Sequence, residues 1–276
     1  MTGTIASSSN QDLSHQWALV TGASSGFGID FSDILAKRGC NLVLVARSED
    51  KLKQQQQKLE SEYQIKTHVI VMDLAQQQAG KSLFDAIDAA GITINICINN
   101  AGFAVFGKYI DANWEDLVQM FNVDMITLAD LTWRFAKRMK AQGGGHILNV
   151  ASFSGYQPIP MYAGYASAKA FVLNLSEAIN MEMRQDGVNV CALAPGFTRT
   201  NFLKTAGQKE NGFHRRNLMD SYPVAKAGID ALLSGQSSHV PGRKNRVMLF
   251  LSRFMSREFL CKFSLRGMSA GQNPSA

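Results

Sequence analysis

Ser152, Tyr165 and Lys169 have side chains whose types and spacing suit proton transfer to a polarised oxygen. Tyr165 and Lys169 are four residues apart, so they share one face of a helix. A free tyrosine has a pKa of about 10, and a neighbouring ammonium group lowers it. Ser152 can donate a hydrogen bond to a carbonyl oxygen that gains negative charge during hydride attack. We therefore expect Tyr165 to be a general acid, Lys169 to lower its pKa and Ser152 to stabilise the oxyanion.

A competing acid is Tyr162, but the residue four positions later is Ala166, which supplies no cation. A Tyr-x-x-x-Lys pair alone also occurs by chance on exposed helices. The position of Tyr165 and Lys169 after a predicted fifth strand, with a serine and a glycine-rich segment upstream, makes the catalytic interpretation specific.

That glycine-rich segment, Thr21-Gly22-Ala23-Ser24-Ser25-Gly26-Phe27-Gly28, follows an apolar run and opens a helical pattern, as in dinucleotide-binding turns. Its spacing is G-x-x-x-G-x-G, and a purely structural turn is the alternative. Gly22 permits the tight turn, Gly26 lets the backbone approach a pyrophosphate, and Gly28 allows close packing of helix on strand. The residues expected to contact the cofactor are Gly22, Ser24, Ser25, Gly26, Phe27 and Gly28.

The end of the second predicted strand carries Arg47, where an NAD enzyme would need a carboxylate for the ribose hydroxyl. An arginine can pair with a 2′-phosphate, so the sequence predicts NADP(H) rather than NAD(H). In the alternative interpretation, Arg47 is a solvated surface charge and Glu49 binds the ribose.

Two further segments follow predicted strands and are expected to meet the cofactor. Asp73 and Leu74 are placed to meet the adenine ring, and Asn100, Ala101 and Gly102 form a bend of small residues near the cofactor. Each signal is weak alone, because Asp73 can be just a helix cap and the bend just a turn that tolerates positive φ.

The elements that would position these residues alternate between short apolar runs and longer segments of helical period, which predicts an α/β doubly wound parallel sheet of the Rossmann type. Ligands bind outside the carboxyl ends of such strands. Strands are expected over residues 17–20, 41–46, 67–72, 94–98, 146–150 and 188–193, and helices near 26–38, 49–63, 76–90, 114–141 and 162–186.

The length of 276 residues, 46% of them hydrophobic, suits one domain. We expect a disordered leader over 1–14, the domain over 15–242 and a basic amphipathic extension over 243–276. Residues 1–16 lack the features of a signal peptide. The four cysteines are far apart and form no C-x-x-C pair, so we expect no metal site, no disulfide framework and a cytoplasmic location.

The net charge of +6 is concentrated near the C-terminus. Residues 204–276 hold 12 Lys/Arg against 4 Asp/Glu, whereas residues 1–203 hold 16 against 18. No basic motif typical of nucleic-acid binding is present, so a nucleic-acid partner is not expected. Residues 243–268 mix aromatic and basic side chains and are too interrupted to span a bilayer. They could lie on an anionic membrane surface, dock on the domain or bind a second subunit, and a solvated basic face is the simpler alternative.

Over about residues 15–200 the chain resembles the short-chain dehydrogenase/reductase family. The resemblance rests on the glycine-rich turn, Asn99-Asn100-Ala101-Gly102, Phe121-Asn122-Val123, Ser152, Tyr165 with Lys169, and Pro195-Gly196-Phe197-Thr198-Arg199-Thr200. It implies that Asn122 holds a water linking Lys169 to solvent, and that Lys169 binds the nicotinamide ribose. It also implies that Pro195, Gly196, Phe197 and Thr198 touch the nicotinamide amide. We expect a homodimer or homotetramer, although the C-terminal region departs from family members that end in a clean seventh strand, which leaves the family's usual tetramer interface open. One departure is Ala151, where many relatives carry a second serine.

Residues 197–222 occupy the stretch that closes over substrate in this family, and their aromatic residues predict an apolar lid. With Phe103, Phe153, Tyr156 and Met161 expected to face the same cleft, the sequence favours a bulky or apolar ketone or aldehyde, reduced with NADPH. These aromatics could equally serve core packing or a subunit interface. The other functional hypotheses are an NADP-binding regulatory or scaffold protein without catalysis, and an NAD-linked alcohol dehydrogenase that differs in the role of Arg47.

Overall fold

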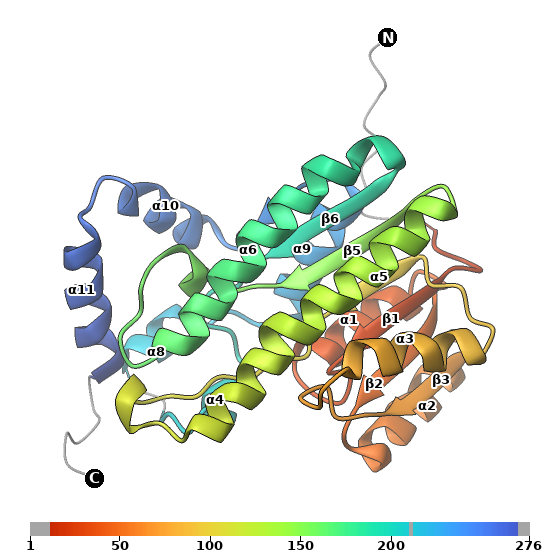
Figure 1. Ribbon diagram of the computed structural model, residues 1–276, viewed down its shortest axis with the longest axis horizontal. Coiled ribbons are helices and arrows are strands. Elements are labelled where there is room, and N and C mark those ends of the chain that lie inside the picture. The colour runs from red at the N-terminus through yellow and green to blue at the C-terminus, as the bar shows by residue number, and fades with distance from the viewer. Residues whose placement is uncertain (1–11, 210–211, 270–276) are drawn as a thin grey trace.

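The computed structural model describes residues 12–209 and 212–269, and within them a seven-stranded sheet forms the centre of the molecule (Figure 1). All strand pairs are parallel, in the order β3-β2-β1-β4-β5-β6-β7. The predicted Rossmann-type sheet is confirmed. The short strand β7 was not predicted, because two residues show no periodicity. The strands are β1 (Trp17–Thr21), β2 (Asn41–Ala46), β3 (Thr67–Val71), β4 (Ile96–Asn99), β5 (Gly145–Val150), β6 (Val188–Leu193) and β7 (Ser238–His239).

Helices cover both faces of the sheet because successive strand residues point to opposite sides. Leu19 and Val20 of β1 belong to different core clusters, one packed with α3 and α5 and the other with α1, α2 and α9. In Figure 1, α5 and α6 cross in front of the sheet. The covering helices are α1 (Phe27–Ala36), α2 (Glu49–Tyr63) and α9 (Ser221–Leu233) on one face, and α3 (Ala79–Ala89), α5 (Leu128–Ala141) and α6 (Ala163–Met183) on the other.

The predicted helix over 114–141 is interrupted. It consists of α4 (Trp114–Phe121), a π-helical segment (Asn122–Thr127) and α5. Single π turns widen a helix locally and often mark functional sites. In the part of the chain that the structure describes, short 3₁₀ segments lie at Tyr109–Asp111, Phe153–Tyr156 and Arg184–Asp186.

The predicted leader and extension are only partly described, since residues 1–11 and 270–276 lie outside the described ranges. Within the described part of the predicted leader, Leu13 is fully buried in the core and its amide donates to the Arg38 carbonyl over 2.9 Å. The later helices are α7 (Phe202–Thr205), α8 (Gly212–Asn217), α10 (Arg243–Ser252) and α11 (Arg257–Ser269). Among the described helices, none has the length and apolar character needed to cross a bilayer.

Candidate active site

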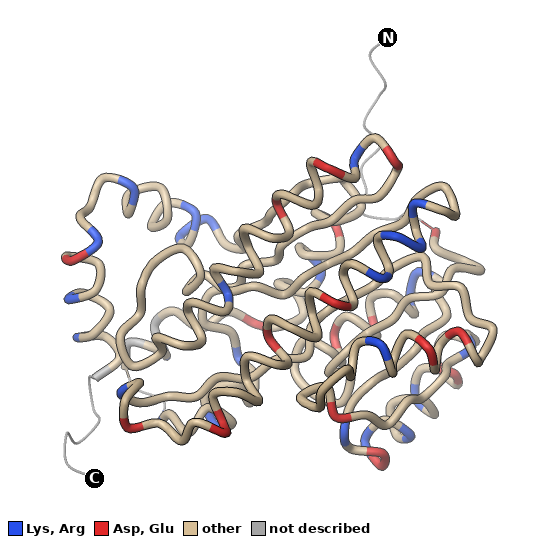
Figure 2. Tube along the Cα trace, viewed as in Figure 1, with Lys and Arg blue, Asp and Glu red and all other residues tan. Residues whose placement is uncertain are grey.

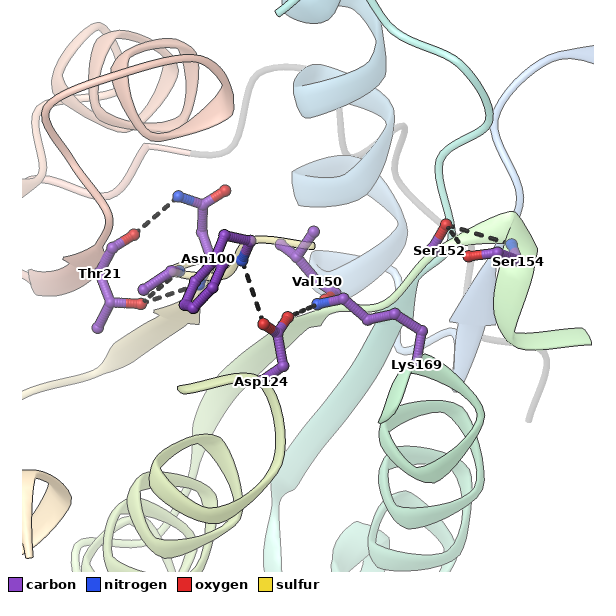
Figure 3. Close-up of polar contacts among 9 residues, drawn as sticks. Thr21, Asn100, Asp124, Val150, Ser152, Ser154 and Lys169 are labelled. Carbon is purple, nitrogen blue, oxygen red and sulfur yellow. Dashed lines mark hydrogen bonds and ion pairs between the residues drawn. The ribbon is translucent and has the colours of Figure 1, made fainter. Parts of the chain in front are cut away.

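The glycine-rich turn forms where β1 ends and α1 begins. Gly22 and Gly26 have positive φ angles of 66° and 51°, which glycine adopts without steric cost. Thr21 fastens this turn to the neighbouring bend, since its Oγ1 accepts hydrogen bonds from the amides of Asn100 (2.9 Å) and Ala101 (3.0 Å). The Asn100 side chain donates to the Thr21 carbonyl over 2.8 Å, as Figure 3 shows. The two expected cofactor segments thus lie together at the carboxyl edge of the sheet.

The Lys169 side chain extends from α6 toward the end of β5 (Figure 3). Its Nζ donates to the Val150 carbonyl over 2.8 Å and lies 2.6 Å from Oδ1 of Asp124. The same Nζ lies 5.6 Å from the centre of the Tyr165 ring. Only 4% of the Lys169 side chain and none of the Asp124 side chain is exposed to solvent. The predicted Tyr165 and Lys169 pair is therefore brought together, with a carboxylate that the sequence analysis did not select.

The expectation that Asn122 holds a water linking Lys169 to solvent stays a prediction, and the Asn122 side chain forms its hydrogen bond elsewhere. Its Nδ2 donates to the Ala75 carbonyl over 3.0 Å, and Asn122 does not line the cavity described below. Asp124, two residues later, points to Lys169 instead. Positions two apart on a helix lie on different faces, and the π turn that fixes which of them faces inward leaves no mark on apolar periodicity.

Tyr165 is 8% exposed and packs between aromatic rings, with the Tyr162 ring centre at 5.9 Å and that of Phe202 at 5.2 Å. Burial raises its pKa, the Asp124 carboxylate raises it further, and a hydrogen bond from Ser152 acts in the opposite direction. The net direction is upward, opposite to the lowering expected from Lys169. The hydroxyl keeps its proton, as a general acid requires. The rival Tyr162 instead donates to Gln208 over 2.7 Å.

Ser152 lies two residues after the end of β5, at the N-cap of the 3₁₀ segment Phe153–Tyr156. Its Oγ accepts hydrogen bonds from the Ser154 amide (3.2 Å) and the Ser154 hydroxyl (2.8 Å), as drawn in Figure 3. The Ser152 proton is thereby left to be donated elsewhere, which suits its predicted role toward Tyr165 or a substrate oxygen.

One cavity of about 1240 Å³ connects the glycine-rich turn with Tyr165. Of the predicted site residues, Gly28 and Asn122 do not line it, and Gly28 instead packs α1 against the turn. Lys51 and Asp124 line the cavity but were missed; Lys51 had no strand or motif to single it out. The predicted residues that do line it are Gly22, Ser24, Ser25, Gly26, Phe27, Arg47, Asp73, Leu74, Asn100, Ala101, Gly102, Ser152, Tyr165, Lys169, Pro195, Gly196, Phe197 and Thr198.

Beyond Tyr165 the cavity has an apolar wall. Phe103 and Phe153 line it as expected, whereas Tyr156 and Met161 do not. The described part of the predicted lid is held at its two ends, where the Met219 amide donates to the Phe197 carbonyl over 2.9 Å. The predicted extension also contributes to this wall, through Val247, Met248, Leu251, Met255, Phe259, Leu260 and Phe263.

Comparison with known proteins identifies the family. The sequence profile described as short chain dehydrogenase matches residues 16–211. The chain belongs to the short-chain dehydrogenase family. The family expected from the motifs is thus confirmed, together with its Rossmann-type fold.

Two relatives of this short-chain dehydrogenase are named for their substrates, a very-long-chain 3-oxoacyl-CoA and a 7beta-hydroxysteroid. Very-long-chain 3-oxoacyl-CoA reductase-A of Danio rerio is 33% identical over 193 residues, which are 68% of this chain and 60% of the relative. The 7beta-hydroxysteroid dehydrogenase of Mediterraneibacter gnavus is 32% identical over 191 residues, 68% of this chain and 71% of the relative. A solved short-chain dehydrogenase from Sphingobium yanoikuyae in complex with NADPH is 26% identical, has a TM-score of 0.78, and is matched over 95% of this chain and 98% of that chain.

Proposed function

We propose that this short-chain dehydrogenase reduces a bulky or apolar ketone or aldehyde to an alcohol with NADPH. One observation carries the proposal: Ser152, Tyr165 and Lys169 line the same cavity as the glycine-rich turn and Arg47. A hydride donor bound along the turn would have its reactive end near the Tyr165 hydroxyl. An assembled acid, oxyanion donor and ammonium also argues against a scaffold that has lost catalysis.

The residues at the nucleotide end of the cavity fit a cofactor with an added phosphate. Arg47, Ser48 and Lys51 line the cavity, so Lys51 contributes a second cation four residues after Arg47. Glu49, the alternative ribose ligand, does not line the cavity and lies 2.7 Å from Lys53. The arrangement supports NADPH over NADH, in keeping with the NADPH bound in the Sphingobium structure.

Replacing Arg47 tests this preference. Arg47→Asp puts a carboxylate where the 2′-phosphate would lie, and we expect the ratio of kcat/KM for NADPH to that for NADH to fall by about tenfold or more. Steady-state kinetics with both cofactors on one ketone measure the ratio. Lys53→Asp makes the same charge change on α2 away from the cavity and should leave the ratio unchanged. An unmoved ratio in Arg47→Asp would reduce Arg47 to a surface charge.

The reaction needs one proton and one hydride at the carbonyl. Bound NADPH supplies the hydride. Tyr165 gives its proton to the carbonyl oxygen, and Ser152 donates a hydrogen bond that stabilises charge on that oxygen. Lys169 uses two of its three donor directions on Val150 and Asp124, which leaves the third for the ribose hydroxyls. The tyrosinate that results is reprotonated from solvent.

The apolar wall supports a large substrate. Phe153, Phe197 and Phe202 line the cavity, with the Phe202 ring centre 5.2 Å from that of Tyr165, and side chains of α10 and α11 line it too. Such a surface gains from burying hydrocarbon and offers few partners to a sugar. A panel of steroid, long-chain and small polar ketones, followed by loss of NADPH absorbance, tests the class. Turnover of none of them, with NADPH bound, would favour the regulatory or scaffold alternative.

We further propose that α10 and α11 contact an anionic membrane surface. Phe250 and Phe254 are 57% and 76% exposed, do not line the cavity, and pack with ring centres 5.4 Å apart. Figures 1 and 2 show both helices at one end of the molecule with cations along them. Each cation near an anionic surface contributes about 1 kcal/mol. The cations are Arg243, Lys244, Arg246, Arg253, Arg257, Lys262 and Arg266, against the acid Glu258.

Vesicle sedimentation tests the membrane proposal. The full chain should co-sediment with vesicles containing phosphatidylserine, less with phosphatidylcholine alone, and less again at high salt. Phe250→Ser with Phe254→Ser should weaken this binding, whereas Ile110→Ser, which removes an 89% exposed side chain elsewhere, should not. Equal binding by both variants, or a change only in self-association, would assign the surface to another partner.

We also retain two proposals from the sequence, a homodimer or homotetramer and a cytoplasmic location. Self-association is supported by exposed apolar side chains on and before α5, with Ile126 61% and Trp133 57% exposed. A reducing compartment is supported by Cys40, Cys97 and Cys191, which are unpaired and buried.

A further inference from the structure

Asp124 and Lys169 form a buried ion pair beside the proton donor. The carboxylate is fully buried; Oδ1 lies 2.6 Å from Lys169 Nζ, and Oδ2 accepts the Phe103 amide over 3.1 Å. Figure 3 shows the Lys169 amine between this carboxylate and the Val150 carbonyl. Burying two charges costs free energy unless both are well paired. The mechanism above uses Lys169 and gives its partner no role.

Space for the pair depends on a glycine of the nucleotide bend. A Cβ atom on Gly102 would lie 2.5 Å from Asp124 Oδ1 and 3.4 Å from Lys169 Nζ. The absence of a side chain at Gly102 therefore lets the carboxylate reach the ammonium. The pair is enclosed by three segments of the site: the Gly102 and Phe103 bend, the π-helical segment and α6.

We propose that Asp124 is a positioning residue that fixes the Lys169 ammonium beside Tyr165 and offsets its charge toward the Tyr165 hydroxyl. The inference rests on the proposed carbonyl reduction. The polar and titratable groups around Tyr165 are Asp124 on the π-helical segment, Ser152 after β5, and Tyr162 and Lys169 on its own helix. Phe202 of α7 closes the remaining side without charge.

The sign of the effect follows from the charges. Burial raises the pKa of Asp124, and the Lys169 ammonium and the Phe103 amide act in the opposite direction by stabilising the carboxylate. When Asp124 is ionised, the ammonium cannot favour the phenolate fully, and burial and Asp124 together raise the pKa of Tyr165. Reduction needs the protonated phenol, so it is retained until the pH exceeds that raised pKa. Removing the carboxylate charge leaves Lys169 uncompensated, which lowers the pKa of Tyr165. Reduction then fails, and alcohol oxidation begins, at a lower pH.

Ultraviolet titration of tyrosinate in the cofactor-free full chain tests the pair without activity. Subtracting the titration of the matching Tyr165→Phe protein isolates Tyr165 from the other tyrosines. We expect Tyr165 to ionise roughly one to three pH units lower in Asp124→Asn than in the wild-type chain. Asp88→Asn, which removes a carboxylate 2.7 Å from Arg138 on the protein surface, is the matched control and should leave the titration unchanged. An unmoved titration in Asp124→Asn overturns the proposal.

A second variant covers the case in which the uncompensated ammonium of Asp124→Asn prevents folding. Asp124→Asn with Lys169→Met removes both charges, and the pH midpoint of its alcohol oxidation with NADP⁺ is compared with that of the wild type. If Asp124 offsets the charge of Lys169 in the wild type, the pH midpoints of the double variant and the wild type should coincide, even if the double variant turns over slowly. A midpoint more than about one pH unit higher shows that Lys169 acts uncompensated in the wild type and overturns the proposal. Absence of turnover in the wild type, with the Tyr165 titration shifted as expected, would defeat the proposed function and leave the role of Asp124 intact.

Discussion

Tyr165→Phe is expected to lower kcat for ketone reduction by about 10²- to 10⁴-fold, the usual contribution of a general acid. The substitution removes one oxygen and keeps the ring that packs against Tyr162 and Phe202. Folding and NADPH affinity should therefore change little. Stopped-flow or steady-state loss of NADPH absorbance measures the rate, and fluorescence titration measures NADPH binding.

Tyr162→Phe is the matched control for this prediction. It removes the hydroxyl that donates to Gln208, so the protein loses one hydrogen bond, worth about 1 kcal/mol. We therefore expect kcat to fall by no more than roughly fivefold. If the two variants lost activity equally, or if Tyr165→Phe turned over like the wild type, Tyr165 would not be the acid.

Because burial and Asp124 raise the pKa of Tyr165, wild-type reduction should show no loss caused by this group between neutral and moderately alkaline pH.

The sequence predicted those parts of the site at which the backbone or the chemistry requires one particular type of residue. The turn around Gly22 and Gly26 needs positive φ angles, and Arg47 follows a strand whose end is recognisable from its apolar run. Tyr165 and Lys169 are joined by the geometry of one regular helix. Local pattern was sufficient in each case, and the cavity contains these residues as expected.

The parts that the sequence could not predict depend on irregular backbone or on packing between distant segments. The π turn decides that Asp124 rather than Asn122 meets Lys169, and it changes no periodicity. The burial of Leu13 depends on a partner carbonyl at Arg38. The predicted extension forms part of the cavity wall because α11 packs against the site. Met268 of α11 is 6% exposed and lies in the same apolar cluster as Tyr165.

Gly28→Ala tests how α1 is held against the turn, and its two physical effects oppose each other. Alanine favours a helix over glycine by about 1 kcal/mol. A Cβ atom at Gly28, however, would overlap the Gly22 carbonyl oxygen and lie 2.8 Å from the Ala23 Cα, both backbone atoms that cannot rotate away. Overpacking costs about 1–3 kcal/mol or more, and here it must displace the turn itself.

We therefore expect Gly28→Ala to lower the melting temperature and to weaken NADPH binding by more than about tenfold, which corresponds to about 1.4 kcal/mol. Thermal unfolding with and without NADPH and fluorescence titration measure both effects. Gly212→Ala in α8 is the matched control, because a Cβ there meets no atom within 4 Å, and its stability should change by less than about 0.5 kcal/mol. Wild-type NADPH affinity in Gly28→Ala would show that the close approach of α1 to the turn does not shape the cofactor site.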